Sequence, residues 1–161
     1  MNFAKAPLLA LATILGAGAV SAQHLKPEEM IIARQAGYRT MDWNMDKIKA
    51  QLEAPADKFD KKLVLNAAKV VQAIANSGMG ALYAPGTDKA AGEVKTRLKP
   101  EFFDPANKEE LTKIAMNFGT QANKLAEVAE GGDQKAIQAQ FGETGKACKG
   151  CHDKFRAKEK H

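Results

Sequence analysis

Apolar residues recur every three, four or seven positions along most of the chain, which is the period of amphipathic helices packed in a bundle. Near the N-terminal end, two rows of such residues run side by side and define one helix face. They are Ile31, Tyr38, Met45 and Leu52, with Arg34, Met41 and Ile48 as the companion row. Pro27 suits the first helical position and Pro55 cannot continue a helix. We therefore predict a first helix from about Pro27 to Ala54. Arg34 is the exception in the pattern, because a charged residue occupies a core position.

A second helix is predicted over about 57–76, followed by the glycine-rich stop SGMG at 77–80. Its buried face is marked by Phe59, Leu63, Val70 and Ile74. The following segment, about 81–103, contains two prolines before Asp104 and is predicted to be a long loop with a short helical turn around 90–98. A helix hidden in this segment is the alternative.

A third helix is predicted to begin at Asp104-Pro105 and to end at Gly131-Gly132. Its apolar positions repeat every seven residues and are Leu111, Phe118 and Leu125. Asp133 is expected to cap a fourth helix, which carries Ile137, Phe141, Cys148 and Phe155 on one side. Beta signals are scarce. The predicted fold is all-α, an antiparallel four-helix bundle with a long loop between the second and third helices.

The first 22 residues differ in composition from the rest. Lys5 precedes an apolar run from about Ala6 to Ala19, and Val20 and Ala22 stand at the −3 and −1 positions of a cleavage site. This layout is typical of a secretory signal peptide. A transmembrane anchor is the alternative, but the run is short for a span of about 20 residues. We predict cleavage after about Ala22, a periplasmic location and a single bundle domain over 23–161.

The charge of the chain is mildly basic. The formal net charge is +5, or +4 once Lys5 has left with the leader. Both signs are interspersed, as on a solvated surface, and we expect neither a nucleic-acid partner nor a membrane span in the mature chain. One basic cluster lies near the C-terminus and consists of Lys146, Lys149, Lys154, Arg156, Lys158 and Lys160.

The strongest chemical signal is CKGCH at 148–152, which holds the only two cysteines. On a helix, Cys148, Cys151 and His152 share one face. C-x-x-C-H is the attachment signature of a c-type haem. Two thiols at this spacing can each bond one vinyl group of the porphyrin, and the adjacent histidine can reach the iron. The motif therefore predicts one covalently bound haem c.

Three other uses of the motif stay open but fit less well. A zinc site needs about four ligands, and the remaining histidines, His24 and His161, are near the two ends. A redox dithiol is expected beside a βαβ pattern, which we do not find. A disulfide between cysteines three residues apart closes too small a loop to stabilise much.

On these residues the chain resembles the cytochrome c′ family. The resemblance rests on KPEE at 26–29, RQ at 34–35, the helical layout and CKGCHDKFR at 148–156, whereas the middle matches only in pattern. It implies an exported four-helix bundle with a haem on the last helix. It also implies a homodimer whose subunits pair through the first two helices.

The resemblance implies roles for individual residues on the last helix. Cys148 and Cys151 would hold the porphyrin, and His152 would be the proximal iron ligand. Arg156 would be the basic residue beside that histidine, one turn beyond it.

On the first helix, Arg34 and Gln35 would contact the haem propionates. A propionate partner would explain a charge on a core face, since a buried charge needs pairing. The alternative for Arg34 is a place at the bundle edge, with its stem buried and its head in water.

Tyr38 falls where the family has a bulky residue over the distal side of the iron. We expect it to crowd that side without ligating, so that the iron is five-coordinate and open to NO and CO. Alternatively, Tyr38 is an ordinary core residue. A further alternative is that Met30, Met41 or Met45 supplies a sixth ligand, which would give a closed His/Met electron-transfer haem.

The expected function is binding of NO or CO together with transport of single electrons, and not enzymatic turnover. An enzyme would need a distal acid–base group, for which the histidines outside the motif are poorly placed. The basic cluster could steer acidic redox partner proteins, or it could be a solubilising tail.

Overall fold

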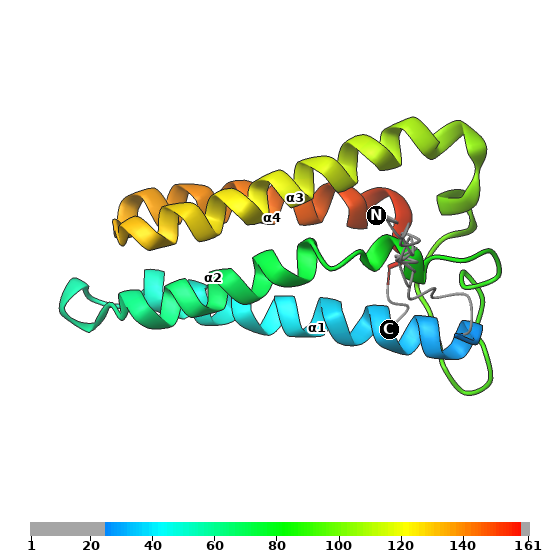
Figure 1. Cartoon of the computed structure of the whole chain (residues 1–161), viewed down its shortest axis with the longest axis horizontal. Coiled ribbons are helices and arrows are strands. Elements are labelled where there is room, and N and C mark those ends of the chain that lie inside the picture. The colour runs from blue at the N-terminus through cyan, green and yellow to red at the C-terminus, as the bar shows by residue number, and fades with distance from the viewer. Residues whose placement is uncertain (1–24, 159–161) are drawn as a thin grey trace, which may run out of the picture.

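The computed structural model describes residues 25–158, so the predicted leader and its cleavage site lie outside the described range. Within it the chain forms the helices α1 (Pro27–Leu52), α2 (Lys61–Ala75), α3 (Lys108–Gly131) and α4 (Gln134–Phe155). The hairpins α1–α2 and α3–α4 lie side by side, and one long connection joins α2 to α3 at the end of the bundle where α4 finishes (Figure 1). The predicted antiparallel bundle and long loop are confirmed.

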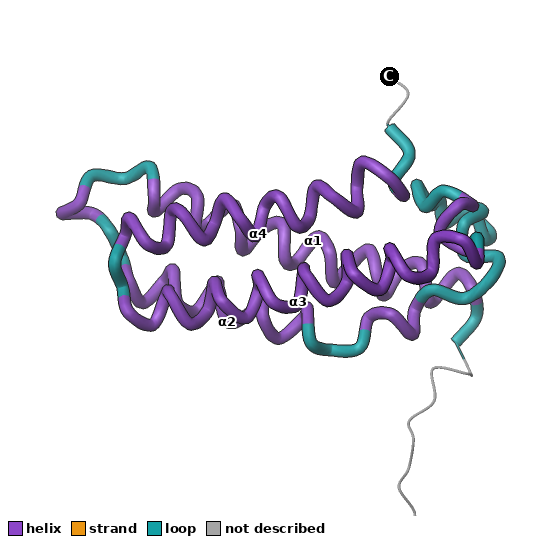
Figure 2. The backbone as a smooth tube through the Cα atoms, turned by 90° about the horizontal axis from the view of Figure 1, so that it is seen from above, coloured by secondary structure: helices purple, strands orange, loops and turns teal. Residues whose placement is uncertain are grey.

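No α-helix in the described part of the chain is long and apolar enough to cross a membrane. The helices form a bundle with short turns at one end and the long connection gathered at the other (Figure 2).

Local sequence explains most helix boundaries. Pro27 opens α1, as predicted. Asp133 caps α4, because its side chain accepts hydrogen bonds from the N–H groups of Lys135 and Ala136. Gly132 ends α3 in the left-handed conformation, with φ 75°, which a glycine adopts without steric cost.

The start of α2 lies four residues later than predicted. Asp60 Oδ1 accepts a hydrogen bond from the N–H of Leu63 at 2.9 Å, so the helix begins after this cap. The preceding Ala56–Lys58 form a separate 3-10 turn behind Pro55. Phe59 therefore precedes the helix, although it still packs against the core as expected.

The connection between α2 and α3 contains short 3-10 turns at Met79–Leu82, Pro100–Phe103 and Pro105–Asn107, the last of which leads into α3. The helical turn predicted around 90–98 is wrong, because Ala91 and Val94 pair there in an isolated β-bridge.

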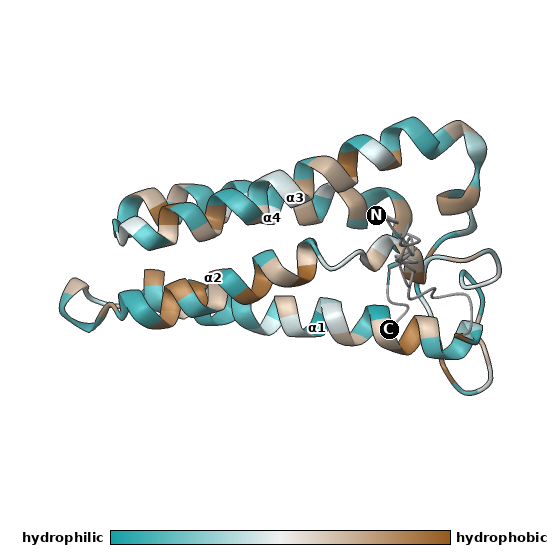
Figure 3. Cartoon of the chain, in the orientation of Figure 1, coloured by the Kyte–Doolittle hydropathy of each residue, from teal (hydrophilic) through white to brown (hydrophobic). Residues whose placement is uncertain are grey.

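The core lies toward the end of the bundle that carries the short turns. Its larger cluster draws on all four helices and consists of Ile48, Val64, Ala67, Ala68, Leu125, Ala126, Ala129 and Ile137. A second cluster of Met41, Val71 and Ala122 continues it along the bundle. Hydrophobic and hydrophilic residues alternate around each helix, as expected for helices with one buried face (Figure 3).

The helices differ in length in a way that shapes the other end. α2 has 15 residues, whereas α1 has 26, α3 has 24 and α4 has 22. At about 1.5 Å per residue, α2 is roughly 10 Å or more shorter than its neighbours. Near the end of α4, the bundle is therefore formed by three helices and the long connection.

Candidate haem site

The CKGCH motif occupies the last turns of α4 (Gln134–Phe155), at the end of the bundle where α2 is missing. Cys148 and Cys151 are half-buried, in line with the buried Thr144 and Phe155 on the inner side of the helix. His152 lies next to this row and is exposed. The helix thus turns both thiols inward from neighbouring turns, as the spacing predicted.

The state of the two thiols discriminates between the alternative uses of the motif. Both cysteines are free in this structure. Burial raises the pKa of Cys148 and of Cys151, whereas reactive dithiols have lowered pKa values. Within residues 25–158, no group of three or more His, Cys, Asp or Glu side chains is placed to hold a metal ion. The direction of these pKa shifts is opposite to that of a redox dithiol.

The apolar face of α3 near the motif end of α4 could accommodate a large apolar group. Along α3, one apolar row runs from residue 111 to residue 129. Its second half, with Ala122, Leu125 and Ala129, is fully buried. Its first half, which runs antiparallel to the motif end of α4, is only half-buried and consists of Leu111, Ile114 and Phe118. The side chains of this first half are only partly covered by other protein residues. A porphyrin is a large apolar group that could cover them.

Tyr38 lies on α1 beside the motif. Its side chain is 39% exposed, so it is not an ordinary core residue. Burial of its hydroxyl raises the pKa of Tyr38, and the charges of Cys151 and Cys148 would act on it. The hydroxyl of Tyr83, in the long connection, donates a hydrogen bond to the Tyr38 hydroxyl at 2.8 Å. Tyr83 was missed from the sequence because it lies in a segment without helical periodicity.

Arg34 is buried, with 3% exposure, so the alternative that its head lies in water is wrong. The guanidinium donates hydrogen bonds to Thr87 Oγ1 at 2.6 Å, Thr96 Oγ1 at 2.9 Å and the Leu82 carbonyl at 3.3 Å. It also donates to the Thr87 carbonyl. These four bonds account for all N–H groups on its two terminal nitrogens.

Gln35 acts on the same segment, because its Nε2 donates to the Lys95 carbonyl at 2.7 Å. Arg34 and Gln35 thus tie the long connection to α1. Contact of either residue with haem propionates stays a prediction. In such a contact, Arg34 would use Nε or exchange one of its present partners.

The long connection also runs along the end of α4. The N–H of Lys99 donates to the Phe155 carbonyl at 2.9 Å, and the N–H of Ala157 donates to the Arg97 carbonyl at 2.7 Å. Arg156 is exposed one turn beyond His152. The pKa of His152 is lowered, first by desolvation and then by the charge of Arg97. This favours the neutral imidazole, the form that binds a metal.

The methionines proposed as alternative ligands are packed elsewhere. Met41 belongs to the cluster with Val71 and Ala122, and Met45 packs against both core clusters. Met30 is buried near the start of α1. Their positions are those of core residues.

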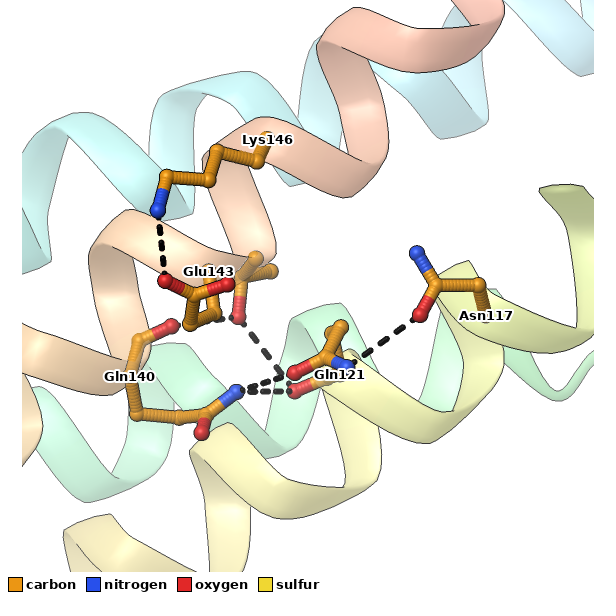
Figure 4. Close-up of polar contacts among 6 residues, drawn as sticks. Asn117, Gln121, Gln140, Glu143 and Lys146 are labelled. Carbon is orange, nitrogen blue, oxygen red and sulfur yellow. Dashed lines mark hydrogen bonds and ion pairs between the residues drawn. The ribbon is translucent and has the colours of Figure 1, made fainter.

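A polar seam between α3 and α4 lies about one to two turns before Cys148 (Figure 4). Gln140 Nε2 donates to Gln121 Oε1 at 2.8 Å, and Gln121 Nε2 donates to Asn117 Oδ1 at 3.2 Å. The buried Thr144 hydroxyl bonds the Gln140 carbonyl at 2.9 Å. Gln121 therefore faces the neighbouring helix α4.

Fold and motif together define a class of protein, the four-helix-bundle c-type cytochromes. A family model described as Cytochrome C′ matches residues 29–156. The cytochrome c′ of Allochromatium vinosum is 56% identical over 142 residues, which cover 88% of this chain and 89% of that protein. This chain belongs to the cytochrome c′ family, whose cofactor is haem c.

Solved structures agree with this assignment. A cytochrome c′ with an unusual ligand-controlled dimer dissociation has a TM-score of 0.78 and 57% identity, over 83% of this chain and 98% of that one. The cytochrome c′ of Alcaligenes xylosoxidans has been solved as a variant with carbon monoxide bound. It has a TM-score of 0.66 and 26% identity, over 83% of this chain and 98% of that one. Another variant of that protein was solved with NO bound.

Proposed function

We propose that this chain is a periplasmic haem protein whose five-coordinate iron binds NO and CO and also exchanges single electrons. Cys148 and Cys151 would hold the porphyrin and His152 would ligate the iron. When bound, the haem supplies an iron that takes a diatomic gas as sixth ligand or changes its charge by one electron.

The observation that carries the proposal is the position of Tyr38. Its phenol interacts electrostatically with both cysteines and accepts a hydrogen bond from a second phenol, whereas Met41 is buried in a core cluster. A phenol in this place narrows access to the distal side, and the side chain that could close the iron is occupied elsewhere. Binding of carbon monoxide and NO by a relative of the same fold supports the choice of ligands.

The test is the absorption spectrum of the ferric and ferrous protein, with and without NO and CO. We expect high-spin spectra in both oxidation states and new bands with each gas. The competing function, a closed His/Met electron carrier, predicts a low-spin spectrum with a methionine-to-iron band at the red end. Met30→Leu, Met41→Leu and Met45→Leu, each made singly, separate the two, because a replacement changes the ligation only if that methionine is the sixth ligand.

We further propose a homodimer that pairs on the outer face of α1 and α2. Ile32 and Trp43, eleven residues apart on α1, are 50% and 62% exposed. A groove between α1 and α2 is lined by Asn44, whose buried Oδ1 has no hydrogen-bond partner within the described residues. A second copy of the chain could cover these apolar residues and donate a hydrogen bond to Asn44 Oδ1. Dimer formation by a relative of 57% identity supports a second copy of the chain as the partner on this face.

Size-exclusion chromatography of Trp43→Glu tests the dimer. We expect this variant to elute as a monomer and the natural protein as a dimer. Met116→Glu is a matched control, since Met116 on α3 is also exposed, at 68%. Equal elution of Trp43→Glu and the natural protein would contradict the proposed face.

Electron exchange would use the basic cluster near the motif, although ion pairs neutralise part of it. Lys146 pairs with Glu143 (Figure 4), with 2.7 Å between the nitrogen and the oxygen. Lys149 and Lys154 also pair with carboxylates. Arg156 and Lys158 would then be the main contacts for an acidic partner. Electron transfer to such a partner should slow as salt is added, and a salt-independent rate would point to a solubilising tail.

The periplasmic location and the absence of catalytic turnover belong to the same proposal. The first is tested by cell fractionation and by sequencing the N-terminus of the mature protein, which is expected to begin at Gln23. The second is tested by assaying peroxidase and NO reductase activity, and turnover in either assay would contradict it.

A further inference from the structure

The ring of Tyr83 is held on both faces. Phe102 stacks on it with 4.5 Å between ring centroids and 20° between planes. The Arg34 guanidinium carbon lies 4.8 Å from the Tyr83 centroid, over the ring. Since a stacked phenyl ring covers the face on which it packs, the guanidinium must lie over the other face. The Tyr83 ring therefore has little freedom to move.

Both partners of Tyr83 are themselves anchored. Arg34 is buried and bonded to Thr87 and Thr96. Phe102 packs edge-on against Phe155, with 5.7 Å between centroids and 84° between planes. Because Phe155 is buried near the end of α4, Tyr83 is fixed relative to both α1 and the helix that carries the motif.

Tyr38 is less tightly held than Tyr83. It is 39% exposed, and the hydrogen bond of 2.8 Å from the Tyr83 hydroxyl ties its tip to the fixed loop residue. Burial raises the pKa of both phenols, so both carry their protons at neutral pH. When Tyr83 donates to Tyr38, the Tyr38 proton stays available for another acceptor.

We infer that Tyr83 is a positioning residue for the haem site, because its hydroxyl holds Tyr38 over the distal side and so limits the entry of gas ligands. The inference rests on the proposed function, in which Tyr38 crowds that side. The long connection between α2 and α3 then has a definite role, since it carries Tyr83 to the first helix.

The test compares haem-loaded Tyr83→Phe, Tyr38→Phe and the double variant by the rate of CO association. Tyr83→Phe keeps the ring and removes only the hydroxyl. We expect CO association about fivefold faster in Tyr83→Phe, which corresponds to the loss of one net hydrogen bond. In the Tyr38→Phe background the same change should alter the rate less than about twofold, because the bond no longer exists. Phe103→Leu, a change in the same aromatic cluster that leaves both hydroxyls, should stay near the natural rate.

A second readout does not depend on gas binding. The unfolding equilibrium constant of Tyr83→Phe should rise about fivefold, and adding this change to Tyr38→Phe should raise it no further. Equal effects of Tyr83→Phe in both backgrounds, on rate and on unfolding, would overturn the inference, as would no effect at all. If the natural protein forms no CO complex, the proposed function and control of gas entry fail together. The unfolding measurement then decides the Tyr38–Tyr83 pair separately.

Discussion

The two ends of the bundle cover their apolar rows to different degrees. At the end with the short turns, Ile48, Leu125 and Ile137 are 0% exposed. At the motif end, the same row of α3 continues with Leu111 and Phe118, which are only half-buried. The row stays apolar along its length, but its larger side chains lie at the motif end and two alanines, Ala122 and Ala129, lie in the buried half. The larger side chains are therefore the less covered ones.

This difference indicates how the chain accommodates a large cofactor. A shortened α2 removes one wall of the bundle near Cys148 and Cys151, and the long connection closes the tip. A covalently held porphyrin would complete the core there. The haem would then stabilise the motif end by burial of apolar surface as well as by its covalent bonds.

The largest expected effect comes from removing the attachment points. Cys148→Ala combined with Cys151→Ala should abolish covalent haem, because both thioether bonds are lost. Haem staining of the denatured protein and its absorption spectrum measure this. Gly145→Ala is a matched control on the same helix, since a Cβ at this position has no neighbouring atom within 4 Å. Covalent haem retained in the cysteine double variant would contradict the site.

The next effect compares the two halves of the α3 row. In the haem-free cysteine double variant, Leu125→Ala should lower the free energy of unfolding by about 3 kcal/mol, because it leaves a cavity in a closed core. Leu111→Ala should cost less than about 1.5 kcal/mol there, because Leu111 is half-exposed. In the haem-loaded protein the cost of Leu111→Ala should rise. Denaturant unfolding of both forms measures these values, and an equal cost of Leu111→Ala with and without haem would argue against contact with the cofactor.

Arg34 gives a smaller effect, confined to the motif end. Arg34→Met should lower the free energy of unfolding by about 2 kcal/mol, because it leaves the buried Thr87 without its donors. Arg34→Lys should rescue only part of this loss, since one ammonium cannot reproduce the fork of bonds. Hydrogen exchange should speed up in the segment around 87–96 and stay unchanged in α2. Uniform acceleration across the chain would show that Arg34 does not act locally.

The smallest effect is expected in the polar seam between α3 and α4. Gln140→Ala should cost about 1 kcal/mol, because its amide bonds Gln121 across the seam. In a double-mutant cycle with Gln121→Ala, the two changes should cost less than the sum of the single changes. Unfolding experiments on the four proteins measure this coupling, and strict additivity would show that the seam contributes no shared interaction.

Much of the fold follows from the sequence because its signals are local. Helix periodicity, the Asp133 cap and the Gly132 stop each depend on residues within one or two turns, and the structure confirms them. The inward direction of Cys148 and Cys151 likewise follows from helical spacing alone.

The remaining features depend on contacts between distant residues. Arg34 was identified as anomalous, but its partners Thr87 and Thr96 lie in a loop more than fifty residues away. Tyr83 lies outside the periodic apolar pattern of the helices. Its connection to the candidate haem site is the hydrogen bond with Tyr38, which the sequence does not reveal. The wrong helical turn around 90–98 has the same origin, since this segment takes its shape from bonds to α1 and α4 and not from local propensity.

The most direct test of an open iron is the absorption spectrum of the ferrous protein before and after addition of CO. The account predicts a high-spin, five-coordinate spectrum that converts to a CO complex. A low-spin ferrous spectrum that CO does not change would show that a protein side chain closes the sixth position, and would contradict the proposed gas-binding role.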